Sequence, residues 1–223
     1  MPRPPNRPLL LPMRVWDAAT RLCHWTRGLL VLAAWFCAET ERFRLHILCG
    51  LGVLTLLLFR LIWGFVGSDT ARFSHFLGNP RLAVRHLAHF TERGPDTEIG
   101  HNPAGGWMVL VLLAVLAVQV VSGLFNPGDT GGPLAAHASA AWAELAGRVH
   151  EANFAVLLVL VGLHIAAVFA YAIVKRHDLV RPMVTGTKRL PATLRQPRMA
   201  SPLLALGVLL LALGAVVLLK LLA

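Results

Sequence analysis

Charged side chains are scarce in this sequence. Asp, Glu, Lys and Arg make up 14% of its 223 residues and hydrophobic residues 56%, whereas soluble domains carry about 25% charged residues. The mean hydropathy is +0.63. So little charge cannot cover the surface of a water-soluble protein. The composition therefore excludes a soluble globular domain and indicates a chain whose natural solvent is the lipid bilayer.

Cysteine is also scarce, with three residues: Cys23, Cys37 and Cys49. They form neither C-x-x-C nor C-x-x-C-H, so neither a zinc knuckle nor covalent attachment of a c-type haem is indicated. Cys37 and Cys49 would come near one another at the same end of a helical hairpin. We nevertheless expect all three to be free cysteines that pack among apolar side chains.

The basic residues are abundant, and their positions carry the information. The 21 lysines and arginines exceed the 11 acidic residues and give a net charge of +10. They form no patch interleaved with aromatic side chains, so nucleic acid is not an expected partner. Most lie in the stretch up to Arg27, in the loop Gly67–Asn102 and after Val174, and the opposite loops hold only Arg42, Arg44 and Arg148. Because basic residues collect on the cytoplasmic side, the sequence predicts a multi-pass membrane protein with a cytoplasmic N-terminus.

Five segments are apolar enough, or nearly so, to span a bilayer, which takes about 20 residues. They are approximately Arg21–Ala38, His46–Val66, Pro103–Phe125, Glu151–Val174 and Pro202–Leu222. The first is the least apolar, because two arginines and a histidine interrupt its first half. We expect an all-α membrane protein: an N-terminal tail (residues 1–12), a four-helix transmembrane bundle (13–190), and a linker with a fifth, C-terminal transmembrane helix (191–223).

Two of the segments that connect these spans have distinctive sequences. Pro80–Phe90 places arginines opposite apolar residues, which predicts a short amphipathic helix along the cytoplasmic interface. Asn126–Ala141 is rich in Gly, Pro and Ala, which favours a loop.

Four of the ten histidines fall in or at the ends of these spans: His24, His46, His150 and His164. Ionisable side chains inside a membrane are costly and mark function by default. His150 and His164 are fourteen residues apart, so they share one helix face and lie about 21 Å apart along the axis. His24 enters the first span from the cytoplasm, and His46 opens the second at the outer side. Depth therefore pairs His24 with His164 and His46 with His150.

Two facing imidazoles, without Cys or carboxylate, suit a haem iron held from both sides. Imidazole also binds zinc, copper and nickel, so a transition-metal transporter is an alternative. Gly28 follows His24 by four residues and Gly50 follows His46 by four, which places each glycine on the face of its histidine. Small residues also serve close helix packing in membranes, but the repeated offset favours room for a flat macrocycle.

Arginines near these histidines point the same way, because bidentate Arg pairs with carboxylates such as haem propionates. Arg21 and Arg27 flank His24 at three residues on either side. Arg60 lies at the cytoplasmic end of the second span, where it would meet a propionate or a quinone headgroup. Snorkelling to the interface is the alternative for such residues. His101, just before the third span, is a candidate contact of the inner haem or of a quinone.

The remaining histidines lie outside the spans, and we expect solvated surface positions for all of them. They are His75, His86, His89, His137 and His177.

Several stretches together resemble one family. They are Val15–Asp17 with Arg21–Trp25, Phe59–Gly67, His101–Trp107, His150–Glu151 with His164, and Asp178–Arg181 with Met183–Gly186. In this combination the chain resembles the bacterial cytochrome b561 and nickel-hydrogenase b-type cytochrome subunit family over about Met13 to Lys188. The segment after Pro202 lies beyond the resemblance, and the last helix could serve docking or a homo-oligomer contact.

The resemblance implies a four-helix core with two haem b groups, the fourth helix supplying one ligand to each. The family's ligand positions fall on His24, His46, His150 and His164, giving an inner His24–His164 haem and an outer His46–His150 haem. The implied function is electron transfer in the bacterial inner membrane between the quinone pool and a redox partner, a c-type cytochrome or a hydrogenase-like subunit. Whether the chain is itself an enzyme is left open: some family members act alone on superoxide, so a quinone-linked superoxide oxidase is the alternative.

Overall fold

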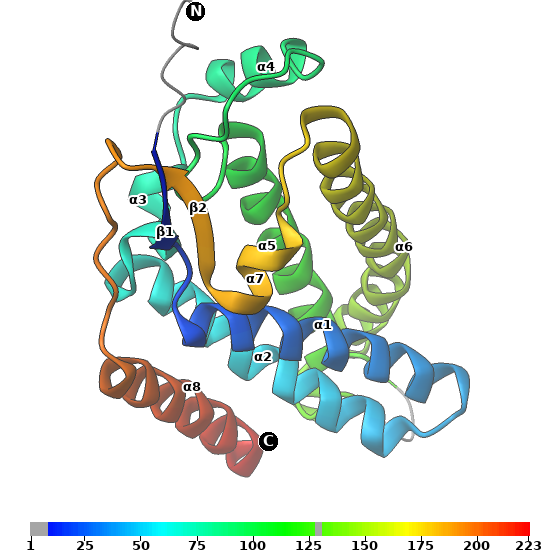
Figure 1. Ribbon diagram of the computed structural model, residues 1–223. Coiled ribbons are helices and arrows are strands. Elements are labelled where there is room, and N and C mark those ends of the chain that lie inside the picture. The colour runs from blue at the N-terminus through cyan, green and yellow to red at the C-terminus, as the bar shows by residue number, and fades with distance from the viewer. Residues whose placement is uncertain (1–8, 128–130) are drawn as a thin grey trace, which may run out of the picture.

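The computed structural model describes residues 9–127 and 131–223, and long helices dominate it (Figure 1). The long helices are α1 (Ala18–Glu39), α2 (Phe43–Val66), α5 (Pro103–Leu124), α6 (Ala140–Ala170) and α8 (Pro202–Leu222). The shorter ones are α3 (Phe73–Phe76), α4 (Pro80–Ala88) and α7 (Val180–Thr185). Single turns are η1 (Asp69–Ala71), η2 (Ala135–His137) and η3 (Tyr171–Lys175), and the two strands are β1 (Leu10–Arg14) and β2 (Thr187–Pro191). The predicted helix at Pro80–Phe90 is confirmed as α4.

Four of the described helices are long and apolar enough to cross a membrane: α2, α5, α6 with its continuation to Lys175, and α8. Their most apolar windows have mean hydropathies between 2.2 and 2.8. α1 is not in this set, although it has 22 residues, because Arg21, His24 and Arg27 lower its hydropathy. The chain is thus a multi-pass membrane protein built on a helical bundle.

The helix bounds differ from the hydropathy prediction most clearly at α6. This helix begins at Ala140, whereas its apolar part begins near Glu151. Ser139 caps it by accepting a hydrogen bond from the Trp142 backbone N–H, at 3.3 Å. One turn further on, Arg148 pairs with Glu144 at 2.8 Å. The first turns of α6 are therefore polar, and a search for apolar runs reads them as part of the outer loop.

The helices pack as two hairpins, α1 with α2 and α5 with α6, and α8 lies against α2 (Figure 1). The main core lies between α2, α5 and α6, with buried leucines Leu51, Leu54, Leu57, Leu113, Leu116 and Leu157. Many outward leucines stay exposed, such as Leu203 at 79% and Leu221 at 78% on α8. Apolar side chains on this outer face are suited to contact with lipid. The three cysteines are free, as expected.

A two-stranded antiparallel sheet covers one end of the bundle (Figure 1). Leu10 of β1 pairs with Pro191 of β2, and Arg14 pairs with Thr187. The prolines are tolerated because both strands are edges. Val15 and Leu190 are completely buried in a small second core beside the sheet. Residues 10–12 thus belong to a strand rather than to the extended tail expected for residues 1–12, of which 1–8 lie outside the described residues.

A buried hydrogen-bond network fastens the start of α1 to the end of α2. Asp17 caps α1 by accepting the Thr20 backbone N–H at 2.6 Å and the Thr20 hydroxyl at 2.9 Å. The Trp63 indole N–H, which is fully buried, donates to Thr20 Oγ1 at 3.1 Å and lies 3.4 Å from Asp17 Oδ2. One carboxylate thus orders both helix ends.

We predict that Asp17→Ala lowers the free energy of unfolding by clearly more than the ~1 kcal/mol of an ordinary N-cap. The additional loss arises because the buried Thr20 hydroxyl loses its acceptor, and with it the orientation that receives the Trp63 N–H. Thermal unfolding followed by circular dichroism in detergent measures it. The control is Asn79→Ala, which removes the exposed cap of α4 on the Arg81 N–H. Equal losses in the two variants would contradict the network.

Candidate functional site

The four intramembrane histidines meet in two pairs. The rings of His24 on α1 and His164 on α6 have centroids 6.3 Å apart, with planes inclined at 54°. The rings of His46 on α2 and His150 on α6 have centroids 6.0 Å apart, inclined at 81°. One helix, α6, therefore contributes a histidine to each pair, at two levels of the bundle.

These separations suit one metal between each pair of rings. A bond from a metal to an imidazole nitrogen is about 2.0–2.1 Å long. Two imidazoles on opposite sides of one metal therefore have their centroids roughly 6 Å apart.

The small number of protein ligands also matters. Across residues 9–127 and 131–223 there is no group of three or more His, Cys, Asp or Glu side chains that could hold a metal ion, and protein zinc sites use at least three such ligands. A porphyrin supplies the other ligands itself. The donor set therefore suits a haem iron better than a bare ion.

The helix surface beside two of the histidines is open, as a flat macrocycle would require. A Cβ built onto Gly28 or Gly50 would meet no described atom within 4 Å. α6 packs chiefly against α5, and its two histidine rings meet those of α1 and α2. The buried Nδ1 of His24 has no hydrogen-bond partner among the described residues. Room, donors and an unpartnered ring nitrogen all fit the haem groups implied by the sequence.

Backbone carbonyls orient the outer pair. His46 Nδ1 lies 2.9 Å from the Ala34 carbonyl oxygen, and His150 Nδ1 lies 2.9 Å from the Gln119 carbonyl oxygen. In this arrangement Nδ1–H donates to the carbonyl, and Nε2 keeps its lone pair for a metal. Both rings are therefore held in the tautomer that an axial ligand needs.

Two residues of α5 that support His150 were not among the candidates from the sequence. The buried Gln119 amide donates to the His150 carbonyl oxygen at 3.0 Å, and its own oxygen accepts from Asn153 at 2.7 Å. Gly123 lies under the ring, because a Cβ there would come 2.8 Å from His150 Cε1. A glutamine in an otherwise apolar span is a usable signal, whereas the glycine carries none that the sequence alone reveals.

Three arginines lie around the His24–His164 pair. Arg60 is 5% exposed, and its guanidinium lies 5.0 Å from the Phe73 ring centroid. Among the described residues, buried nitrogens of Arg60 (Nη1), Arg27 (Nη1) and Arg21 (Nε) have no hydrogen-bond partner, although Arg21 Nη1 donates to the Val184 carbonyl oxygen. Burying such groups without partners is costly. The arrangement is typical of a site completed by a bound anion or carbonyl.

His101 stands beside this cationic cluster. Its ring packs against Trp16 at 4.8 Å and against Phe76 at 4.6 Å, centroid to centroid. Its buried Nδ1 is unpartnered among the described residues. Burial, with a smaller contribution from the Arg60 cation, lowers the pKa of His101 to about 3. The ring is therefore neutral at pH 7 and offers a hydrogen bond without a charge.

Two of the histidines expected to be solvated are not. His86 Nε2 lies 2.7 Å from the Tyr171 hydroxyl. The His177 side chain is 16% exposed and lies 3.9 Å from Asp96 Oδ2. Both line a polar pocket. This pocket forms because the segment before α5 and the segment after α6 fold over one another. Local sequence gives no sign of such a contact.

We predict that Gly123→Ala lowers the haem content of the purified protein, because the added methyl group displaces the His150 ring from its carbonyl acceptor. Haem per chain, measured from the visible spectrum of the pyridine complex, should fall below the wild-type value. Gly207→Ala on α8 is the matched control, since a Cβ there meets no described atom within 4 Å. A Gly123→Ala protein with full haem content would show that the ring does not depend on this glycine.

One comparison with known proteins identifies a family. A family model described as prokaryotic cytochrome b561 matches residues 15–186. No curated protein and no solved structure matches the chain significantly. The matched residues include all four paired histidines, Arg60 and His101, and they end before α8.

Proposed function

The chain belongs to the prokaryotic cytochrome b561 family, and from this membership we propose that it passes electrons between membrane quinone and a redox partner through two haem b groups. The membership makes it a membrane b-type cytochrome of electron transport. The family generally binds haem b. The number of haems, the quinone and the partner are our proposals.

The two-haem proposal is supported by the two pairs of facing imidazole rings, whose centroids are 6.3 Å and 6.0 Å apart. His24 and His164 hold the inner haem, and His46 and His150 hold the outer one. Gly28 leaves room beside the inner group. When bound, the haem iron takes up and releases single electrons, at a potential that its axial ligands and surroundings set.

The surrounding residues then have distinct roles. Gly50 leaves room beside the outer haem, as Gly28 does beside the inner one. Arg21 and Arg27 pair with propionates of the inner haem through charge-assisted hydrogen bonds. Backbone carbonyls hold the outer imidazoles in one tautomer, which raises their basicity as ligands.

The quinone headgroup binds beside the inner haem, between Arg60 and His101. Both side chains have buried nitrogens without a partner among the described residues. A cationic donor and a neutral imidazole suit the two states of a quinone oxygen, carbonyl and hydroxyl. The aromatic rings of Phe73 and Phe76 flank Arg60 and add an apolar wall.

The helices cross the bacterial inner membrane, with the N-terminus and the inner haem on the cytoplasmic side. The distribution of basic residues supports this orientation. α1 crosses as well, because its polar side chains face the inner haem rather than lipid. α8 follows the matched segment and packs on α2, leaving an outward apolar face for lipid or a second copy.

A c-type cytochrome or a hydrogenase-like subunit exchanges electrons with the outer haem. A stand-alone superoxide oxidase is the second candidate. It is favoured by a depression of about 400 Å³ lined by Glu41–Leu45, directly before His46. Arg42 and Arg44 lie in this depression and would attract an anion such as superoxide.

We predict two haem b groups per chain in the pyridine assay, and about one in His150→Ala, because that change removes a ligand of the outer haem alone. The reduced-minus-oxidised spectrum should lose one component. His137→Ala, an exposed histidine in η2, should keep both. One haem or none in the wild type would refute the model, and loss of both in His150→Ala would refute the independence of the two sites.

We predict that Arg60→Gln weakens the reaction with a short-chain quinone at least tenfold in KM, since a charge-assisted hydrogen bond contributes about 1.5–3 kcal/mol. The variant should retain both haems. The control is Arg148→Gln, because Arg148 is exposed and lies near the start of α6, away from Arg60. Unchanged quinone kinetics would remove Arg60 from the quinone site, and selective loss of the inner haem would assign it to a propionate instead.

A further inference from the structure

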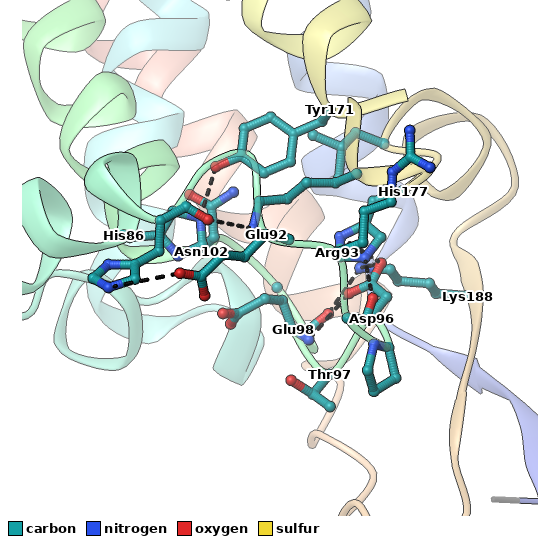
Figure 2. Close-up of a pocket in the computed structure, with 16 residues that line it drawn as sticks. His86, Glu92, Arg93, Asp96, Thr97, Glu98, Asn102, Tyr171, His177 and Lys188 are labelled. Atoms are coloured by element: carbon teal, nitrogen blue, oxygen red, sulfur yellow. Dashed lines mark hydrogen bonds and ion pairs between the residues drawn. The ribbon is translucent and has the colours of Figure 1, made fainter. Parts of the chain in front are cut away.

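A polar pocket of about 270 Å³ lies beside the proposed quinone site. Figure 2 shows side chains converging on it from three parts of the chain: α4, the segment before α5, and the segment from the end of α6 to β2. Its acids and bases include Glu98, Asp96, His86, His177, Lys175 and Lys188. Such a concentration of titratable groups in a membrane protein calls for an explanation.

The pocket is connected inward by hydrogen bonds. The Tyr171 hydroxyl lies 2.7 Å from His86 Nε2, and the Asn102 side chain lines the same pocket (Figure 2). Tyr171 is the single tyrosine of the chain, and it is buried, as is Asn102. Asn102 caps α5 through the Gly105 N–H at 2.7 Å and directly follows His101. Polar side chains therefore extend from the pocket to Asn102, the neighbour of His101 in the proposed quinone site.

Glu98 is the acid placed to exchange protons in this pocket. Burial raises the pKa of its carboxyl, against the opposing effect of the Lys188 ammonium. The other charged groups that face it are Asp96 on the same segment, and His177 and Lys175 after α6. Burial lowers the pKa of His86, and the neighbouring Lys175 ammonium and His177 side chain add to this effect. A carboxyl group whose pKa is raised and an imidazole that is neutral at pH 7 are suited to transfer protons.

The proposed reaction needs such groups. Conversion of one quinol to quinone releases two electrons and two protons, and the reverse reaction consumes them. The electrons pass one at a time to the proposed haem groups. The cations around the inner pair, Arg21, Arg27 and Arg60, cannot exchange the protons because guanidinium does not titrate in proteins. The protons must therefore leave through other side chains.

We propose that this pocket is the proton exit and entrance of the quinone site. Protons from a quinol beside His101 pass alongside Asn102, whose amide does not titrate, to the Tyr171 hydroxyl and on to His86 and Glu98, and from there to cytoplasmic water. Quinone reduction uses the same groups in reverse. This inference rests on the proposed quinone function and adds the route of its protons.

The test uses the purified full-length haem protein in detergent and a short-chain ubiquinol. Haem reduction is followed by visible absorption in a stopped-flow instrument from pH 5.5 to 9, and proton release by a pH dye. The wild-type rate should rise with pH through the pKa of Glu98, because the carboxylate is the base. Glu98→Gln should slow the reaction at least about tenfold at pH 7 and lose this step, and Glu98→Asp should restore it.

A second variant and a readout independent of turnover accompany it. Tyr171→Phe should slow the same reaction while the reduction of haem by dithionite stays normal. An infrared pH titration of the resting protein should show a carboxylic-acid band that Glu98→Gln removes. Glu144→Gln on α6, exposed at the opposite end of the bundle, should match the wild type in every measurement.

The outcomes separate the two proposals. If ubiquinol does not reduce the haem of the wild type, the quinone function fails and the proton route fails with it. If the wild type reacts but Glu98→Gln and Tyr171→Phe keep its rate and pH profile, the proton route alone is overturned.

Discussion

The architecture depends on holding two imidazoles about 6 Å apart, centroid to centroid, at two levels of one bundle. Helix α6 must present His150 and His164 on one face, about 21 Å apart along its axis at 1.5 Å per residue. Their partners come from both helices of the other hairpin, His24 from α1 and His46 from α2. The hairpins must therefore pack at a fixed distance. Between them, α2 and α5 supply that contact through the leucine core.

The arginines beside the His24–His164 pair are explained by the same requirement, that paired imidazoles hold a bound group. A chain with few charged residues nevertheless buries Arg60 and partly buries Arg21 and Arg27 around the His24–His164 pair, and a bilayer makes this expensive. The cost is tolerable if each guanidinium meets an anion or a carbonyl brought by a bound group. The Asp17–Thr20–Trp63 network lies beneath this cluster and fixes the end of α2 that carries Arg60. The structural network and the proposed binding site thus share one helix end.

Much of this arrangement could be predicted from the sequence, because its signals are local. Spacing along a helix placed His150 and His164 on one face, and charge asymmetry gave a depth to His24 and His46. The polar start of α6, by contrast, is held by Ser139 and by the Glu144–Arg148 pair, which hydropathy does not register. β1 and β2 join segments far apart in the chain, so neither strand has a local signal. Gly123 and Tyr171 acquire their roles only through neighbours on other elements.

The end of α6 explains how electron and proton chemistry could be combined in one fold. Tyr171 follows His164 by seven residues, close to two turns, so both lie on nearly the same helix face. At Tyr171 the helix widens into the π-type turn η3, which ends at Arg176 in the left-handed region, φ 59°. Such wide turns are rare and are frequent at functional sites. Here the turn lets both Lys175 and His177 reach the pocket beside Tyr171. A regular helix would separate these two side chains by about 200°, and they could not both face one pocket.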